Sequence, residues 1–107
     1  MHALLVTADV EPGREVEGLE YLRAMLPDLQ QIPGLLSGYW LATTKDGESL
    51  AIVIFDDEAA AKEMAEIGLP NAPQLPGATF RGAEVREVVA QISAACGLAE
   101  LVDSARA

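Results

Sequence analysis

Residues 39–58, YWLATTKDGESLAIVIFDDE, establish the architecture, because three structural signals follow one another within them. Residues 45–48 contain an Asp-Gly pair, which supplies the positive φ angles that tight hairpin turns need. The strand expected next, residues 49–55, is apolar on both faces, as strands covered from both sides are. The three acids at residues 56–58 favour a helix start, where carboxylates accept hydrogen bonds from free N–H groups. We therefore predict a hairpin that leads directly into a helix.

The chain before this hairpin supplies a strand, a helix and a second strand. Residues 3–10 are rich in apolar and β-branched residues and stop at the turn signal Glu-Pro-Gly of residues 11–13. Residues 14–31 predict an amphipathic helix with a kink or break at Pro27, which lacks an N–H group. The strand that pairs across the hairpin is predicted at residues 35–44. The apolar stripe of the helix consists of Val16, Leu19, Leu22, Met25, Leu26 and Leu29.

The chain after the hairpin repeats the order of helix and strand. The helix that begins at residues 56–58 is predicted to end with Gly68 as its C-terminal cap. Residues 69–78 contain three prolines and predict a loop. A fourth strand is expected from residue 79 or 80 to residue 91. The order βαββαβ predicts an α+β protein of ferredoxin-like topology with an antiparallel four-stranded sheet.

The chain divides into one domain, residues 1–91, and an alanine-rich tail, residues 92–107. Two helices cover only one face of a four-stranded sheet, yet the strands carry apolar side chains on both faces. Soluble monomers rarely expose an apolar surface of that size. We therefore expect a two-fold homodimer that packs sheet against sheet. A weak helical stripe in the tail is formed by Ile92, Cys96, Ala99 and Val102.

Composition excludes several classes of protein. Seventeen acids against seven bases give a net charge of −10, which disfavours nucleic acids and anionic membranes as partners. No apolar run reaches the roughly 18 residues of a membrane span, and the N-terminus lacks signal-peptide features. One cysteine, Cys96, excludes an internal disulfide, and with a single histidine, His2, it cannot build a zinc site. We expect a cytoplasmic protein without a metal, and a solvated, frayed His2.

Two motifs resemble the antibiotic biosynthesis monooxygenase (ABM) family of the dimeric α+β barrel superfamily. Residues 33–39, PGLLSGY, resemble the family's PGF-x-G-(F/Y) entry into the second strand. Residues 54–60, IFDDEAA, resemble its third strand and its W/F-x-(S/D)-x-E-A helix start. The resemblance covers residues 3–91. It implies a dimeric α+β barrel that acts as a cofactor-independent monooxygenase on a small aromatic or polyketide-like molecule.

A second function remains open on the same fold, because a fold does not determine an activity. The alternative is a non-catalytic dimer that binds a small ligand or another protein. A deep cavity between the sheet and the helices favours the enzyme, and a filled interior favours the scaffold.

The superfamily also contains haem-degrading enzymes, which resemble one another in three residues. These are an Asn on the first strand, a Trp near the end of the third, and a His in the second helix region. This chain has Thr7 at the Asn position, Ile54 at the Trp position, and no histidine in residues 57–80. Haem iron needs an axial ligand. We therefore expect no haem degradation and no cofactor.

The candidate binding residues are Thr7, Tyr39, Trp40 and Ile54; no catalytic residue is predicted. A cofactor-free oxygenase holds a phenolate in a dry pocket with an aromatic wall and a few hydrogen-bonding groups. The Thr7 hydroxyl can donate to a developing oxyanion. Either Tyr39 or Trp40 forms the wall, because neighbouring strand residues point to opposite faces. The pocket is expected between the helices and the sheet face that carries Leu5, Thr7, Leu50, Ile52 and Ile54.

Overall fold

The computed structural model describes residues 1–93 and 98–101. The main sheet contains β1 (His2–Val10), β2 (Leu35–Trp40), β3 (Glu48–Phe55) and β4 (Ala78–Glu87). The helical elements are α1 (Glu15–Leu29), α2 (Glu58–Glu63), the π-helix η1 (Met64–Gly68) and α3 (Leu69–Asn71). A separate two-stranded sheet pairs β5 (Ala90–Ser93) with β6 (Leu98–Leu101).

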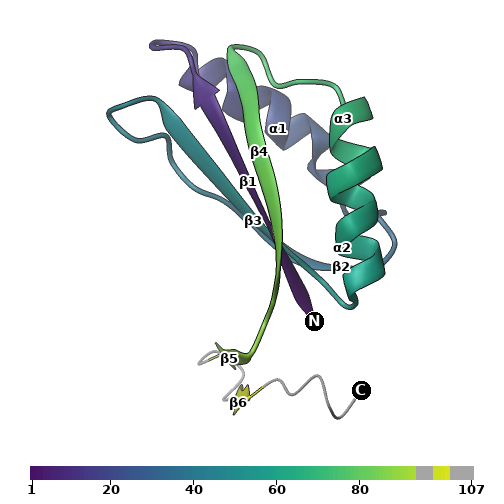
Figure 1. The fold of residues 1–107 in the computed structure, drawn as a ribbon. Helices are drawn as coiled ribbons and strands as arrows, with labels where there is room; N and C mark the ends of the chain where they lie inside the picture. The colour runs from purple at the N-terminus through teal and green to yellow at the C-terminus, as the bar shows by residue number, and fades with distance from the viewer. Residues whose placement is uncertain (94–97, 102–107) are drawn as a thin grey trace.

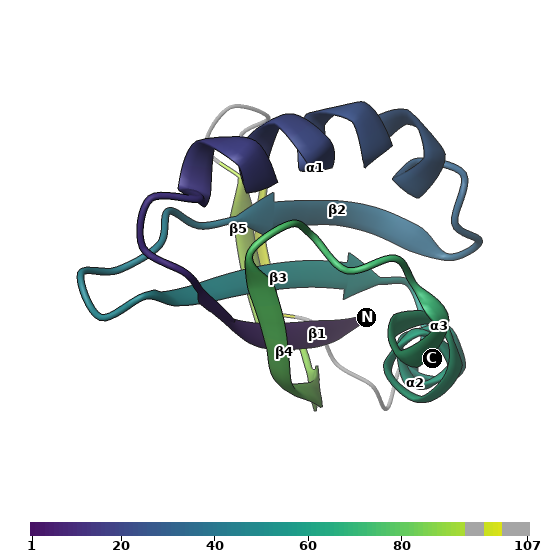
Figure 2. The ribbon, with the colours of Figure 1, turned by 90° about the horizontal axis from the view of Figure 1, so that it is seen from above.

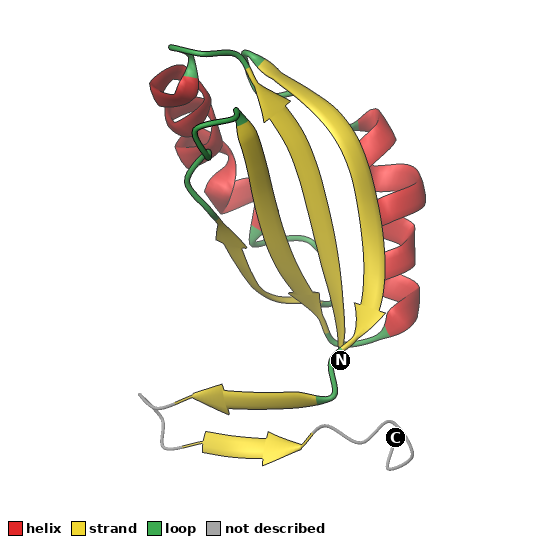
Figure 3. Ribbon diagram, turned by 60° about the vertical axis from the view of Figure 1, so that its left-hand side comes forward, coloured by secondary structure: helices red, strands yellow, loops and turns green. Residues whose placement is uncertain are grey.

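The four strands of the main sheet lie in the order β2-β3-β1-β4, and every neighbouring pair is antiparallel. Both helical segments lie on one side of this sheet, so its other face is open (Figures 1 and 3). The predicted α+β chain with an antiparallel four-stranded sheet is confirmed. The arrangement is compatible with a ferredoxin-like fold.

The core lies between the sheet and the continuous helical segment α2 to α3. Leu4, Phe55 and Ala61 are almost completely buried there, at 1%, 0% and 0% exposure. Leu4 pairs with Val53 on β3 and with Val85 on β4, and both partners pack against this cluster. Even-numbered residues of β1 therefore face the helices, and odd-numbered residues face away from them.

Helix α1 buries less of its apolar stripe than the spacing predicts. Leu22, at the centre of the stripe, is buried, but Val16 and Leu19 are 68% and 55% exposed. The helix runs beside β2, which is an edge strand, so only part of the stripe meets a neighbouring element (Figure 2). Part of the apolar stripe of α1 is therefore left uncovered.

The hairpin and the helix start agree with the predictions. Gly47 adopts a φ of +82° in the turn between β2 and β3. The side chain of Asp57 accepts a hydrogen bond from the N–H of Ala60, at 2.8 Å, and caps α2. β2 ends at Trp40 rather than at residue 44, although Leu41 still donates a hydrogen bond to Leu50 across the hairpin.

The helix ends differ from the predictions in three places. Of the kink or break predicted at Pro27, the break does not occur, because α1 continues to Leu29. Gly68 is not a C-terminal cap: its φ of −62° is helical, and the chain runs on into α3. The start of the predicted loop at residues 69–78 is therefore helical, since Pro70 lies in the first turn of α3, where proline's missing N–H is tolerated.

The tail differs from the predicted helical stripe wherever it is described. β5 and β6 are strands, so Ile92 and Ala99 belong to extended segments. Ile92 is β-branched and favours the extended backbone of β5. Cys96 and Val102 of the proposed stripe lie outside the described residues.

Candidate functional site

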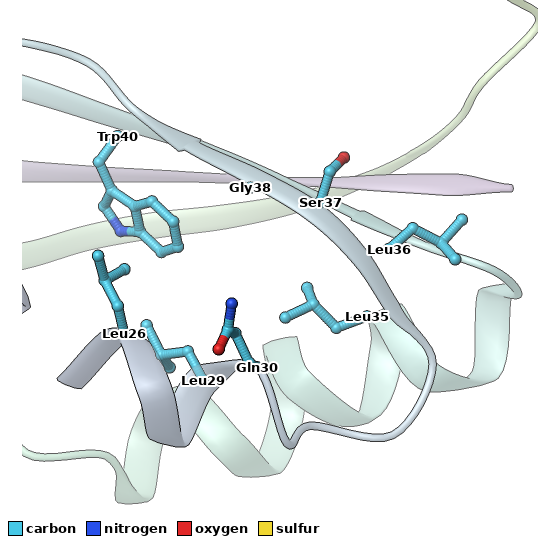
Figure 4. A pocket seen from close by; sticks show the side chains of 8 residues that line it. All are labelled: Leu26, Leu29, Gln30, Leu35, Leu36, Ser37, Gly38 and Trp40. Carbon is cyan, nitrogen blue, oxygen red and sulfur yellow. The ribbon is translucent and has the colours of Figure 1, made fainter.

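A pocket of about 440 Å³ lies between the C-terminal end of α1 and β2. Strand register places Trp40 opposite Ala51 and Gly38 opposite Val53, both on the face toward the helices. α1 supplies the facing wall with the last residues of its apolar stripe. The pocket is lined by Leu26, Leu29, Gln30, Leu35, Leu36, Ser37, Gly38 and Trp40 (Figure 4).

Trp40 forms one wall of the pocket, and Gly38 makes room for it. A Cβ atom built on Gly38 would lie 2.9 Å from Cζ3 and 3.0 Å from Cη2 of the indole. The ring therefore lies across the backbone at Gly38, with its other side toward Leu26 and Leu29 of α1 (Figure 4). An aromatic face opposed by leucine side chains suits a flat, apolar ligand.

Two neutral polar groups border this apolar space. The side-chain amide of Gln30 points between Trp40 and Leu35 (Figure 4). Within residues 1–93 and 98–101, neither this amide nor the indole N–H of Trp40 has a hydrogen-bond partner in the protein. Both groups are therefore free to bond a ligand's hydroxyl or carbonyl group. No lining residue is an acid, a base or a thiol, so the lining itself supplies no general acid or base.

Among the four predicted binding residues, only Trp40 lines this pocket. Thr7, Tyr39 and Ile54 lie on the opposite, open face: Thr7 pairs with Leu50, and Tyr39 with Ile52. The expectation that Leu5, Thr7, Leu50, Ile52 and Ile54 face the helices is wrong. Both faces of β1 are apolar, so alternation alone could not tell which face the helices cover.

The open face is apolar at its centre and charged at one margin. Leu5, Ile52 and Ile54 follow the central strands, and Tyr39 on β2 is 61% exposed. The Thr7 hydroxyl donates a long hydrogen bond of 3.4 Å to the carbonyl oxygen of Gly82. This bond leaves the hydroxyl's own acceptor capacity unused.

At one end of the open face, an ion triad joins three strands. Arg81 on β4 lies 3.4 Å from Asp9 on β1 and 3.4 Å from Glu48 on β3. All three side chains are about half exposed, so solvent screens these pairs and each contributes little stability. Farther along β4, Arg86 lies 3.5 Å from Glu84. Charge on this face is thus close to balanced.

His2 is neither frayed nor solvated, contrary to the prediction. It pairs with Phe55 on one side and Glu87 on the other, because β1 is a central strand from its first residue. Its side chain is only 15% exposed, its Nε2 atom lies 3.5 Å from Glu58, and its Nδ1 atom is buried without a partner. It lies on β1 and lines no part of the pocket beside Trp40.

Sequence reasoning missed every lining residue except Trp40, namely Leu26, Leu29, Gln30, Leu35, Leu36, Ser37 and Gly38. Leu26 and Leu29 belong to the predicted apolar stripe, and residues 35–38 belong to the predicted second strand, so both elements offered a signal. Gln30 offered none. No protein-family model and no curated protein matches the chain. Within the described ranges, no helix is long and apolar enough to span a membrane, and no three metal-ligating side chains cluster.

Proposed function

We propose that the chain is a homodimeric, ABM-like protein that binds a small, flat aromatic molecule in the pocket between α1 and β2. The observation that carries the proposal is the indole of Trp40, which faces the pocket with its N–H unpaired. Stacking on that ring supplies affinity, and the N–H and the Gln30 amide orient a hydroxyl or carbonyl group. The pocket volume of about 440 Å³ suits a ligand of two or three fused rings.

The negative charge of the protein and the dipole of α1 favour a neutral ligand over an anionic one in this pocket. The protein carries a net charge of −10, and the pocket lies at the C-terminal end of α1, where the helix dipole is negative. No basic side chain lines the pocket to offset this potential. Phenols, quinols and polyketide-like aromatics in their neutral form therefore fit better than carboxylates or phosphates.

The proposed dimer uses the open face of the sheet. Leu5, Ile52, Ile54 and Tyr39 supply its apolar centre, and Thr7 lies among them. The charged margin contains three acids (Asp9, Glu48, Glu84) and two bases (Arg81, Arg86), although the whole chain has a large acidic excess. Two copies of this face can therefore meet without strong repulsion, while most acids remain on the outside.

Cofactor-independent oxygenation is a second candidate function of the same pocket. Its support is the combination of apolar walls with two neutral N–H donors, which stabilise the superoxide formed when a quinol passes one electron to O₂ and releases one proton to solvent. Because the lining has no base, the substrate would be an easily oxidised quinol. In this proposal the active molecule requires no cofactor.

Calorimetric titration with 1-naphthol tests the binding proposal. We expect saturable binding that Trp40→Leu weakens by about tenfold, the loss of roughly 1.4 kcal/mol of contact energy. Phe80→Leu is the matched control, because it removes an exposed aromatic ring from the opposite edge strand and should leave affinity unchanged. Equal affinity in the Trp40→Leu variant would reject this pocket as the site.

Oxygen uptake separates the two functions. With 1,4-naphthohydroquinone, an enzyme should consume O₂ faster than the protein-free autoxidation, and Trp40→Leu should remove the excess. Binding of 1-naphthol without any excess uptake favours the non-catalytic alternative. Sedimentation equilibrium should give twice the chain mass of 11.3 kDa for either function.

A further inference from the structure

The pocket beside Trp40 is open along the outer edge of β2. β2 is an edge strand of the sheet, and none of the described strands lies beyond it. Leu26 and Leu36, which line the pocket, are 39% and 54% exposed. Binding sites usually enclose 70–90% of a small ligand's surface. A ligand held by this chain alone would keep more of its surface in water.

The chain also carries exposed apolar side chains beyond the end of β4. We call the two strands β5 and β6 the arm; they follow β4 and lie beyond the body of the protein (Figures 1 and 3). In the part of the chain that the structure describes, these strands form a sheet of two, separate from the main sheet. A lone two-stranded hairpin is at best marginally stable in water. Ile92 on β5 is 79% exposed, and Val89, just before β5, is 65% exposed.

The strand β5 matches the pocket in polarity and in its lack of charge. Residues 88–93, VVAQIS, contain no charged residue in a chain with a net charge of −10. The pocket lining contains none either. A neutral apolar strand can therefore approach the pocket without desolvating a charge.

A second copy of the chain brings the arm to the pocket. Within one chain, the arm leaves from β4 and the pocket lies beside β2, at opposite edges of the sheet. In a face-to-face dimer whose two-fold axis runs parallel to the strands, β4 of one protomer lies over β2 of its partner. The arm then begins next to the partner's open edge, and the free backbone groups of β2 can pair with an added strand.

We propose that the arm of each protomer closes the partner's pocket, with Ile92 packed over the exposed rim that Leu26 and Leu36 form beside Trp40. This inference rests on the proposed dimer and the proposed pocket. It makes the ligand site a composite of two chains, so that a ligand bound by Trp40 is enclosed only in the dimer.

Mixed dimers test whether the arm acts on its partner. Trp40 is the sole tryptophan of the chain, so its emission and its quenching by acrylamide report this pocket alone. In the Ile92→Asp homodimer we expect a red shift, stronger quenching and about tenfold weaker binding of 1-naphthol. Excess full-length Trp40→Phe chain, whose arm is native, should restore native quenching to the Trp40 of Ile92→Asp chains.

The reverse mixture completes the test. Native chains mixed with excess Trp40→Phe/Ile92→Asp chains should show the strongly quenched Trp40, although their own arm is intact. Ile67→Asp is the matched control, because Ile67 is an exposed isoleucine of η1, outside the pocket, and should leave quenching native. Quenching that follows each chain's own Ile92, or that ignores Ile92, overturns the proposal.

Sedimentation of every sample distinguishes failure of the arm from failure of the dimer. We expect Ile92→Asp to remain dimeric, because the sheet faces hold the protomers together. A native chain that sediments as a monomer at all concentrations overturns both the dimer and the arm. A native dimer whose Trp40 does not respond to the partner's Ile92 overturns the arm alone.

Discussion

The indole of Trp40 lies across Gly38, two residues earlier on the same face of β2. A Cβ atom on Gly38 would come within 2.9 Å of the ring, closer than real Cβ contacts come. Glycine at this position therefore determines where the tryptophan lies, and with it the shape of the pocket. The shape of the candidate site therefore depends on the lack of a side chain at Gly38 as well as on the side chains that line the pocket.

Replacing Gly38 by alanine should displace the indole while leaving the sheet folded, because a strand accepts alanine. We expect a shifted Trp40 emission maximum and about tenfold weaker binding of 1-naphthol, measured by calorimetry. Gly82→Ala is the matched control: its Cβ would meet only the Thr7 hydroxyl, at 3.8 Å. Native emission and affinity in Gly38→Ala would show that the ring does not depend on this glycine.

Placing a charge at the centre of the open face should break the dimer. Ile54→Asp would bury a carboxylate at the apolar centre of two packed sheets, where the loss of its hydration is costly. Sedimentation equilibrium should then give the chain mass of 11.3 kDa, with a native circular dichroism spectrum. The same change at Ile67, on η1, should leave the dimer intact. A folded Ile54→Asp dimer would assign the interface elsewhere.

Gly34 should be more sensitive to substitution than Gly13, another glycine with a positive φ. Its φ is +82°, and its Cβ would lie 2.9 Å from both the Ala60 Cβ and an Asp56 carboxylate oxygen. Gly13 has a similar φ of +85° with nothing within 4 Å. Gly13→Ala should cost about 1–2 kcal/mol for the backbone alone, and Gly34→Ala about 1–3 kcal/mol more for the collision. Urea denaturation measures both, and equal losses would refute the collision.

Two substitutions distinguish the stabilisation that Asp57 gives as a helix cap from the stabilisation that its charge gives. Asp57→Ala removes the acceptor for the Ala60 N–H and should cost about 1 kcal/mol of unfolding free energy. Asp57→Asn keeps an acceptor oxygen and should cost clearly less. If thermal or urea unfolding finds the two variants equally destabilised, charge rather than capping explains the residue.

Glu17 should titrate below the usual range for a glutamate. Hydrogen bonds from Arg14, at 3.0 and 3.1 Å, lower the pKa of Glu17, and the same contacts raise the pKa of Arg14. Because the folded-state pKa is depressed, the stabilisation is present above the unfolded pKa and is lost as pH falls through the folded pKa. NMR titration of the Glu17 carboxyl checks this, and Arg14→Gln should return the pKa toward its ordinary value.

Local signals predicted the parts of the fold that depend on local chemistry. The Asp46-Gly47 pair predicted the hairpin, and Asp57 predicted the start of α2, because turns and caps involve residues close in the chain. The end of α2 could not be predicted in this way. Gly68 stays helical against the side chain of Met64, where a Cβ would lie 2.5 Å from Sδ.

The candidate site was less accessible to sequence reasoning, for a reason visible in β1. Leu4 and Leu5 are chemically alike, so nothing in the alternation shows that Leu4 faces the helices and Leu5 does not. Because Leu4 faces the helices, Thr7 and Ile54 lie on the other face of the sheet, away from the pocket that Trp40 lines. The alternation correctly predicted that Tyr39 and Trp40 lie on opposite faces of the sheet. Only the structure shows which of the two faces the helices.

The central position of β1 has a consequence for how the protein is made. β1 is the first strand in the chain, yet its two neighbours are β3 and β4, and His2 pairs with Glu87. During synthesis the strand leaves the ribosome long before either partner exists, with apolar side chains on both faces. Such distant pairings slow folding and expose the early chain to aggregation. The four-stranded sheet can be completed only after β4 has left the ribosome. A chaperone that shields β1 until then should therefore raise the yield of folded protein.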